Sequence, residues 1–103
     1  MVRQPHLSNR EVAVLAYSGL GTFEFGIVVE VFGLPRPEFS EWYTFKVCGL
    51  ERGALKATGG IRIVPKEGLD GLSTAGTIII PGWRTDEQPP KHLLQSICSG
   101  VFV

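Results

Sequence analysis

Residues 11–33, EVAVLAYSGLGTFEFGIVVEVFG, decide the fold because a short apolar run passes directly into an amphipathic one. The run from Glu11 to Tyr17 is typical of a buried strand in a parallel sheet. From Thr22 to Phe32 the apolar residues recur three and four positions apart, which predicts a helix that Thr22 is placed to cap. A strand followed at once by a helix indicates an α/β fold.

The segments that follow continue this alternation. The helix is expected to stop at Gly33, because Pro35 and Pro37 lack amide donors and have fixed φ angles. Gly59-Gly60 separates two short runs, which are consistent with a hairpin or with one bent strand that carries a bulge, and we favour two short strands. The sequence therefore predicts a flavodoxin-like parallel sheet with flanking helices, incomplete at the C-terminus. Its further strands are expected at Trp42–Leu50, Leu55–Thr58, Ile61–Val64 and Thr77–Ile80.

The motif Ser96-Ile97-Cys98-Ser99-Gly100 surrounds a potential nucleophile with small residues, as a sharp strand-to-helix elbow requires. We expect a short helix at Pro90–Leu94, followed by a strand at Leu94–Ile97 that leads into Cys98. An elbow would expose the thiol and aim backbone amides at it, which favours thiolate. The alternative is that Cys98 is a small buried hydrophobic residue at the end of a core strand.

Pro81-Gly82-Trp83 follows an apolar strand and provides a second candidate feature. A glycine there lets a backbone amide approach a neighbouring site, so Gly82 is a candidate oxyanion donor. The alternative is an ordinary Pro-Gly turn.

Glu24 lies on the first turn of the predicted helix and therefore at the carboxyl edge of the sheet, where ligands bind in such folds. Between the apolar residues Phe23 and Phe25 its carboxyl group could be partly protonated and act as an acid or base. The alternative role is to complement the dipole at the start of the helix.

Composition excludes several classes of protein. The 103 residues suffice for one domain, and 10 basic residues balance 10 acidic ones, so no basic surface is expected to contact nucleic acid. No apolar run approaches the roughly 18 residues of a membrane-spanning helix, and the N-terminus has no signal-peptide pattern. A cytoplasmic domain at residues 11–103, after a flexible segment at residues 1–10, is the expectation.

No cofactor or metal is predicted. Cys48 and Cys98 have no CxxC spacing, which argues against a disulfide framework and against a zinc site. Neither His6 nor His92 lies in a motif that would place it beside Cys98.

The motifs Thr22–Gly26, Ile80–Trp83 and Ser96–Gly100 together resemble the ThiJ/PfpI family of the class I glutamine amidotransferase-like superfamily. The runs FEFGIVVEVFGLPRPE, WYTFKVCG, ATGGIRI, IIIPGWR and SICSGVFV are similar to the amino-terminal sensor half of AraC-type transcription regulators of the FtrA and GlxA kind. The resemblance covers residues 10–103. It implies a domain that binds a small-molecule ligand, while a separate helix-turn-helix domain binds DNA.

In the wider family the elbow cysteine is reactive and a carboxylate on the first helix contacts it, so the resemblance implies these roles for Cys98 and Glu24. It further implies a pocket that includes Gly82, Trp83 and Ser99. Hydrolase and glyoxalase-type relatives often have a histidine where this chain has Ser99, which favours a sensor over an enzyme.

Residues 84–97 are a short connection for a helix and a strand, and they suggest an internal deletion relative to the regulators. The chain ends where the helix after the elbow is expected, so exposed apolar surface and a homo-oligomer are predicted. A small cysteine-dependent enzyme (amidase, glyoxalase or deglycase-like) and an inactive fragment are the alternative functions.

Overall fold

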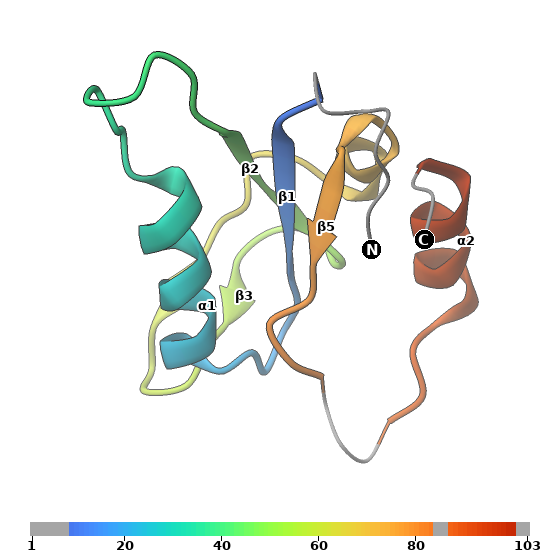
Figure 1. The fold of residues 1–103 in the computed structure, drawn as a ribbon. Helices are drawn as coiled ribbons and strands as arrows, with labels where there is room; N and C mark the ends of the chain where they lie inside the picture. The colour runs from blue at the N-terminus through green and yellow to red at the C-terminus, as the bar shows by residue number, and fades with distance from the viewer. Residues whose placement is uncertain (1–8, 84–86, 101–103) are drawn as a thin grey trace.

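The computed structural model describes residues 9–83 and 87–100, with residues 98–100 described by their backbone alone. It is an α/β fold built on a three-stranded parallel sheet (Figure 1). The strand order β2-β1-β5 confirms the flavodoxin-like arrangement expected from the sequence. The expected flexible segment at residues 1–10 falls mainly on residues 1–8, which lie outside the described residues.

The central strand β1 (Glu11–Ala16) is almost entirely buried, as its apolar sequence predicts. It pairs in parallel with β2 (Thr44–Gly49) along its whole length and with β5 (Thr77–Ile79) over three residues. All three strands therefore end at one edge of the sheet, and the loops that follow β1 and β5 meet there.

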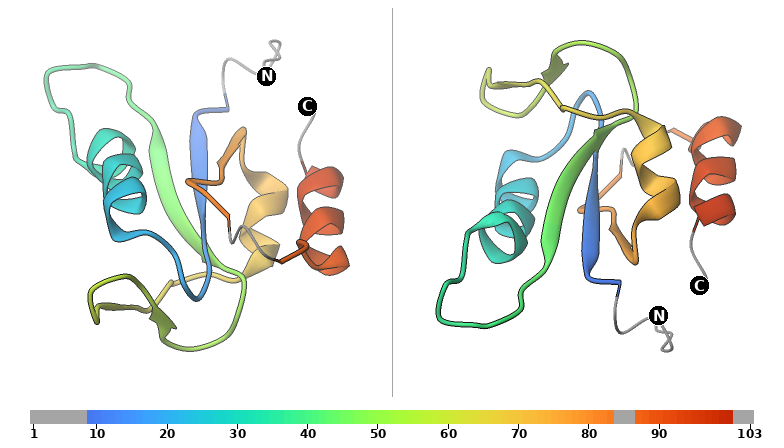
Figure 2. Two further views of the ribbon diagram at one scale, coloured as in Figure 1. Left: turned by 90° about the horizontal axis from the view of Figure 1, so that it is seen from below. Right: turned by 90° about the horizontal axis from the view of Figure 1, so that it is seen from above.

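Helices cover both faces of the sheet (Figure 2). On one face lies α1 (Thr22–Val28), which continues as a π-helical turn, η2 (Val29–Gly33). The other face carries the 3₁₀ helix η3 (Leu69–Thr74), and α2 (Lys91–Gly100) packs on the outside of η3. The prediction of a helix that ends at Gly33 is confirmed.

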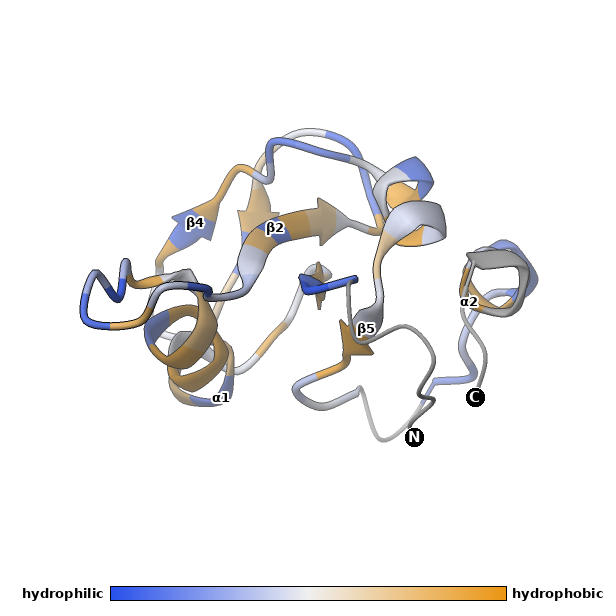
Figure 3. Cartoon of the chain, turned by 45° about the horizontal axis from the view of Figure 1, so that its top comes forward, coloured by the Kyte–Doolittle hydropathy of each residue, from blue (hydrophilic) through white to orange (hydrophobic). Residues whose placement is uncertain are grey.

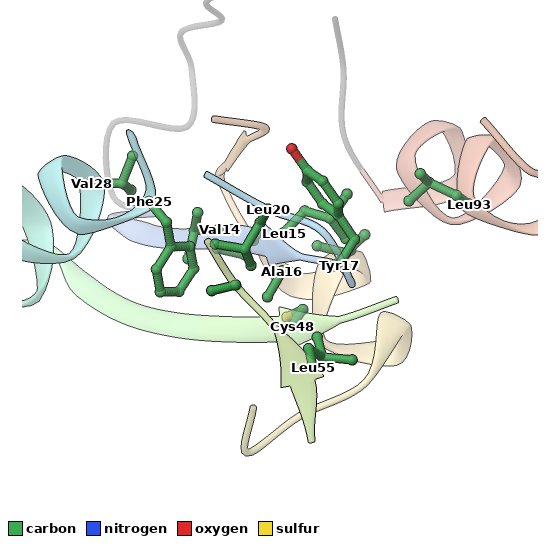
Figure 4. Close-up of a cluster of buried hydrophobic side chains, with 14 residues drawn as sticks. Val14, Leu15, Ala16, Tyr17, Leu20, Phe25, Val28, Cys48, Leu55 and Leu93 are labelled. Carbon is green, nitrogen blue, oxygen red and sulfur yellow. The ribbon is translucent and has the colours of Figure 1, made fainter. Parts of the chain in front are cut away.

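The core lies around β1 (Figure 4). Phe25 and Val28 of α1 pack on one side of the sheet. Cys48 faces η3 on the other side, and its sulfur lies so close to Gly71 of η3 that a side chain there would meet it. Figure 3 shows α1 and β5 as predominantly hydrophobic. Leu93 of α2 is buried against this core and fixes the helix to it.

The hairpin predicted around Gly59-Gly60 is confirmed. The strands β3 (Leu55–Lys56) and β4 (Arg62–Ile63) pair antiparallel. Both glycines have positive φ, +89° and +79°, within the loop that Ala57 and Ile61 close, and a residue with a side chain would adopt these angles only with strain.

Two sequence predictions need correction, and one helix was missed. Thr22 does not cap α1: the N-cap is Gly21, which makes no side-chain capping bond. The helix η3 was not predicted. The strand predicted at Leu94–Ile97 is wrong, because these residues belong to α2. A helix buries Leu93 while Ser96 donates to the carbonyl oxygen of His92 one turn earlier at 3.0 Å, whereas a strand there would need a sheet edge to pair with.

Within residues 9–83 and 87–100, no helix has the length and apolar character needed to cross a membrane.

Candidate functional site

A pocket of about 250 Å³ lies at the carboxyl edge of the sheet, between the loop after β1 and the loop after β5. Parallel α/β sheets bind ligands at this edge because the connections on either side of a strand diverge there. Three of the residues predicted from sequence, Glu24, Gly82 and Trp83, line this one pocket. The complete lining is Tyr17, Gly19, Gly21, Glu24, Pro81, Gly82 and Trp83.

Tyr17 holds the loop after β5 in place. Its hydroxyl donates a hydrogen bond to the carbonyl oxygen of Gly82, and its ring packs against the ring of Trp83 with a centroid distance of 4.8 Å. The indole nitrogen of Trp83 donates to the carbonyl oxygen of Glu87 at 3.0 Å. The pocket therefore has one firm aromatic wall. Gly82 engages this wall through its carbonyl group, and the role of its amide as an oxyanion donor stays a prediction.

Glu24 forms part of the opposite wall. It lies in the first turn of α1, and its carboxylate folds back over Gly21, where a β-carbon would overlap Oε1. The expected apolar enclosure of this carboxyl group is only half present, because Phe25 is buried while Phe23 is 75% exposed. The carboxylate is exposed to solvent and available to a ligand.

Sequence reasoning missed Tyr17, Gly19 and Gly21 as site residues. A signal for them existed, since all three stand between the end of β1 and Glu24. Gly19 has a φ of +94°, which a residue with a side chain adopts only with strain. Gly19 therefore lets the chain turn out of the strand toward α1, close to the pocket.

The predicted elbow at Cys98 is not formed by the backbone. An elbow needs a strand that ends and a helix that begins at the nucleophile, but residue 98 lies near the carboxyl end of α2. Figure 1 shows α2 running antiparallel to the strands, so its last turn lies away from the edge that carries the pocket. The side chains of Cys98 and Ser99 lie outside the described residues, and their predicted roles stay predictions.

The other cysteine, Cys48, is an inert core residue. Its side chain is fully buried, and burial is the main cause that raises the pKa of its thiol to about 11. Lys46 lowers this pKa by a smaller amount, and the acidic neighbours Glu67 and Glu11 raise it further. A thiol that stays protonated at neutral pH is a poor nucleophile.

Lys46 is the centre of a polar cluster on the η3 face. Its ammonium group lies 3.1 Å from Oε1 of Glu11 and 2.7 Å from Oγ1 of Thr74, and Oγ1 of Thr74 donates to the same Glu11 oxygen at 2.9 Å. The Lys46 side chain is only 11% exposed. The cluster ties β1, β2 and η3 together, which is a structural role.

Among the described side chains, no three His, Cys, Asp or Glu residues gather as a metal site would require. Of the predicted constellation, the structure brings Glu24, Gly82 and Trp83 together. No protein-family model, no curated protein and no solved structure matches the chain.

Proposed function

We propose that the chain is a small-molecule-binding domain, the ligand-sensing part of an AraC-type transcription regulator with a ThiJ/PfpI-like fold. The observation that carries the proposal is the convergence of Glu24, Gly82 and Trp83 on one pocket at the carboxyl edge of a parallel sheet. In this proposal the domain acts in the cytoplasm and leaves contact with nucleic acid to another part of the regulator.

The lining of the pocket favours a small cationic ligand. Glu24 offers a carboxylate, and the partly exposed Trp83, backed by the buried ring of Tyr17, offers an aromatic ring. This combination binds an ammonium group by an ion pair and by cation–π attraction. No basic side chain is among the described lining residues to neutralise Glu24. The volume of about 250 Å³ lies below the usual range for drug-sized ligands, so the ligand is a small one.

The cysteine-dependent enzyme has less support. Its nucleophile would sit on an elbow at the carboxyl edge, next to Glu24 and Gly82, whereas the backbone at residue 98 is part of a helix. A binding pocket needs only the side chains that already meet at the edge.

Fluorescence of Trp83 tests the proposal. The chain has two tryptophans, so Trp42→Phe leaves Trp83 as the sole indole reporter. Benzylamine, benzyl alcohol and benzoate present the same ring with positive, neutral and negative substituents. We expect benzylamine to change the emission saturably, with weaker binding by the alcohol and the acid.

The matched variants are Glu24→Gln and Glu30→Gln. Both glutamates lie on the α1–η2 helix, but Glu30 does not line the pocket. Removing one charge-assisted contact is expected to weaken benzylamine binding by about 10-fold or more in Glu24→Gln and to leave it unchanged in Glu30→Gln. Equal behaviour of the two variants, or no saturable response to any of the three probes, would contradict the proposal.

A further inference from the structure

The loop at residues 18–22, which forms the Glu24 side of the pocket, is hydrogen-bonded to the β3–β4 hairpin. The amide of Gly19 donates to the carbonyl oxygen of Lys56 at 2.7 Å, and the amide of Thr58 donates to the carbonyl oxygen of Leu20 at 3.1 Å. Leu20 and Ala57 form a parallel bridge between the two segments. The loop and the first strand of the hairpin are therefore paired side by side, as two short parallel strands would be.

Two threonine hydroxyls add to this connection. Oγ1 of Thr22 donates to the carbonyl oxygen of Thr58 at 2.6 Å, and Oγ1 of Thr58 donates to the carbonyl oxygen of Leu20 at 3.2 Å. Thr22 is the first residue of α1 and stands two positions before Glu24. Its side chain thus joins the hairpin to the helix that carries the carboxylate.

The hairpin is itself anchored in the core. In the hairpin Leu55 is 1% exposed and Ala57 is also buried, and Leu20, which Ala57 pairs with in the loop, is 1% exposed. The amide of Ala57 donates to the carbonyl oxygen of Ile61 across the turn at 2.8 Å. A side chain that hydrogen-bonds to Thr58 is therefore attached to a part of the fold that core packing holds in place.

The start of α1 needs such an external contact. The first amides of a helix lack partners within the helix, and a capping side chain usually supplies one. Gly21 is the N-cap here and makes no side-chain capping bond, so the first turn depends on other contacts for its order. Glu24 lies in that turn.

We propose that Thr22 is a positioning residue of the pocket: its hydrogen bond to Thr58 lets the hairpin fix the first turn of α1 and so holds the Glu24 carboxylate over Gly21, at the pocket. This inference rests on the proposed function for the part that concerns ligand binding. The geometry of the carboxylate is testable without any ligand.

The first experiment is an NMR comparison of the ligand-free protein. Because the Glu24 carboxylate lies against Gly21, we expect the Gly21 amide shift to differ between the wild type and Glu24→Gln. We expect that difference to shrink by at least half in a Thr22→Val background and to persist in Thr22→Ser, which keeps the hydroxyl. A difference that stays undiminished in Thr22→Val would overturn the proposal, whatever the protein binds.

The second experiment measures benzylamine affinity through Trp83 in the Trp42→Phe background. Loss of one hydrogen bond is expected to weaken binding about two- to ten-fold in Thr22→Val, with recovery in Thr22→Ser. Thr77→Val, an exposed threonine at the start of β5, is the control and should bind as the parent does. Unchanged affinity in Thr22→Val would overturn the positioning role. If the parent binds no probe, the proposed function fails, and the Gly21 shift decides the positioning of Glu24 alone.

Discussion

The carboxylate of Glu24 occupies the space that a side chain at position 21 would need. A β-carbon built on Gly21 overlaps Oε1 of Glu24 and lies 3.5 Å from its carboxyl carbon. The backbone at Gly21 has a φ of −78° and a ψ of 123°, which any residue can adopt. The glycine is therefore required by the position of the carboxylate and not by the backbone.

Gly21→Ala is expected to displace Glu24 without unfolding the protein. The obstructing atoms are the end of a flexible side chain, which can rotate away, so the free energy of unfolding should fall by less than about 1 kcal/mol. Benzylamine affinity should fall about as far as in Glu24→Gln. Urea unfolding and a Trp83 titration measure the two quantities.

Gly26→Ala is the matched control on the same helix. A β-carbon at Gly26 meets nothing within 4 Å, and alanine has the higher helix propensity, so this variant should gain about 0.5–1 kcal/mol and bind normally. If Gly21→Ala bound benzylamine as well as Gly26→Ala does, Glu24 would not be part of the site.

The parts of the fold that could be predicted from the sequence are those in which apolar spacing and glycine positions agree. β1 is a continuous apolar run, the α1–η2 helix is long enough for its period to show, and Gly59-Gly60 identifies the hairpin. The helix η3 was not predicted because LDGLST has only two large apolar residues. Its buried residues, Gly71 and Leu72, are adjacent in sequence and show no helical spacing. So short a 3₁₀ helix has too little sequence to show a period.

The strand and elbow predicted at Cys98 are wrong because the small-residue motif around Cys98 was weighed above the helical spacing of the apolar residues before it. Ser96, Ser99 and Gly100 are small enough for an elbow, but the spacing of Leu93, Leu94 and Ile97 equally suits a helix with one face on η3. At the site, the predicted ends of β1 and β5 and the predicted start of α1 were enough to place Glu24 and Gly82 at the same pocket. The contribution of Tyr17 depends on a hydrogen bond across 65 positions of sequence, which no local pattern shows.

Tyr17→Phe is expected to loosen the loop after β5. The variant keeps the ring contact with Trp83 but removes the donor to the carbonyl oxygen of Gly82. The free energy of unfolding should fall by about 1–2 kcal/mol, as for a partly buried hydrogen bond, and Trp83 emission should shift to the red in the Trp42→Phe background. An unchanged unfolding midpoint in urea would mean that the bond contributes no net stability.

Lys46→Met should destabilise the protein because it leaves Glu11 without its cation. Since Glu11 retains some exposure, 31%, the expected loss is about 1–2 kcal/mol, less than for a fully buried pair. Replacing both partners, as in Lys46→Met with Glu11→Leu, should restore at least half of it. A double variant that is less stable than Lys46→Met alone would contradict this account of the cluster.

The thiol of Cys48 should make stability depend on pH in alkaline solution. Its pKa is raised in the folded protein from 9.0 to about 11, chiefly by burial. Below pH 9 the thiol is protonated in both states and the contribution is fully present. As pH rises from 9 to 11 the unfolded chain releases a proton that the folded chain retains, so this contribution of about 3 kcal/mol is progressively lost.

Urea unfolding at pH 8.5 and pH 10.5 measures this loss of stability. Because lysines and tyrosines also titrate in that range, variants are needed to show how much of the loss comes from Cys48. Cys48→Ala should show a smaller fall in the free energy of unfolding between the two pH values, since its side chain cannot ionise. Cys98→Ala keeps the buried thiol and should fall as far as the wild type does. If Cys48→Ala and Cys98→Ala fell equally, burial of Cys48 would not be the origin of the alkaline loss.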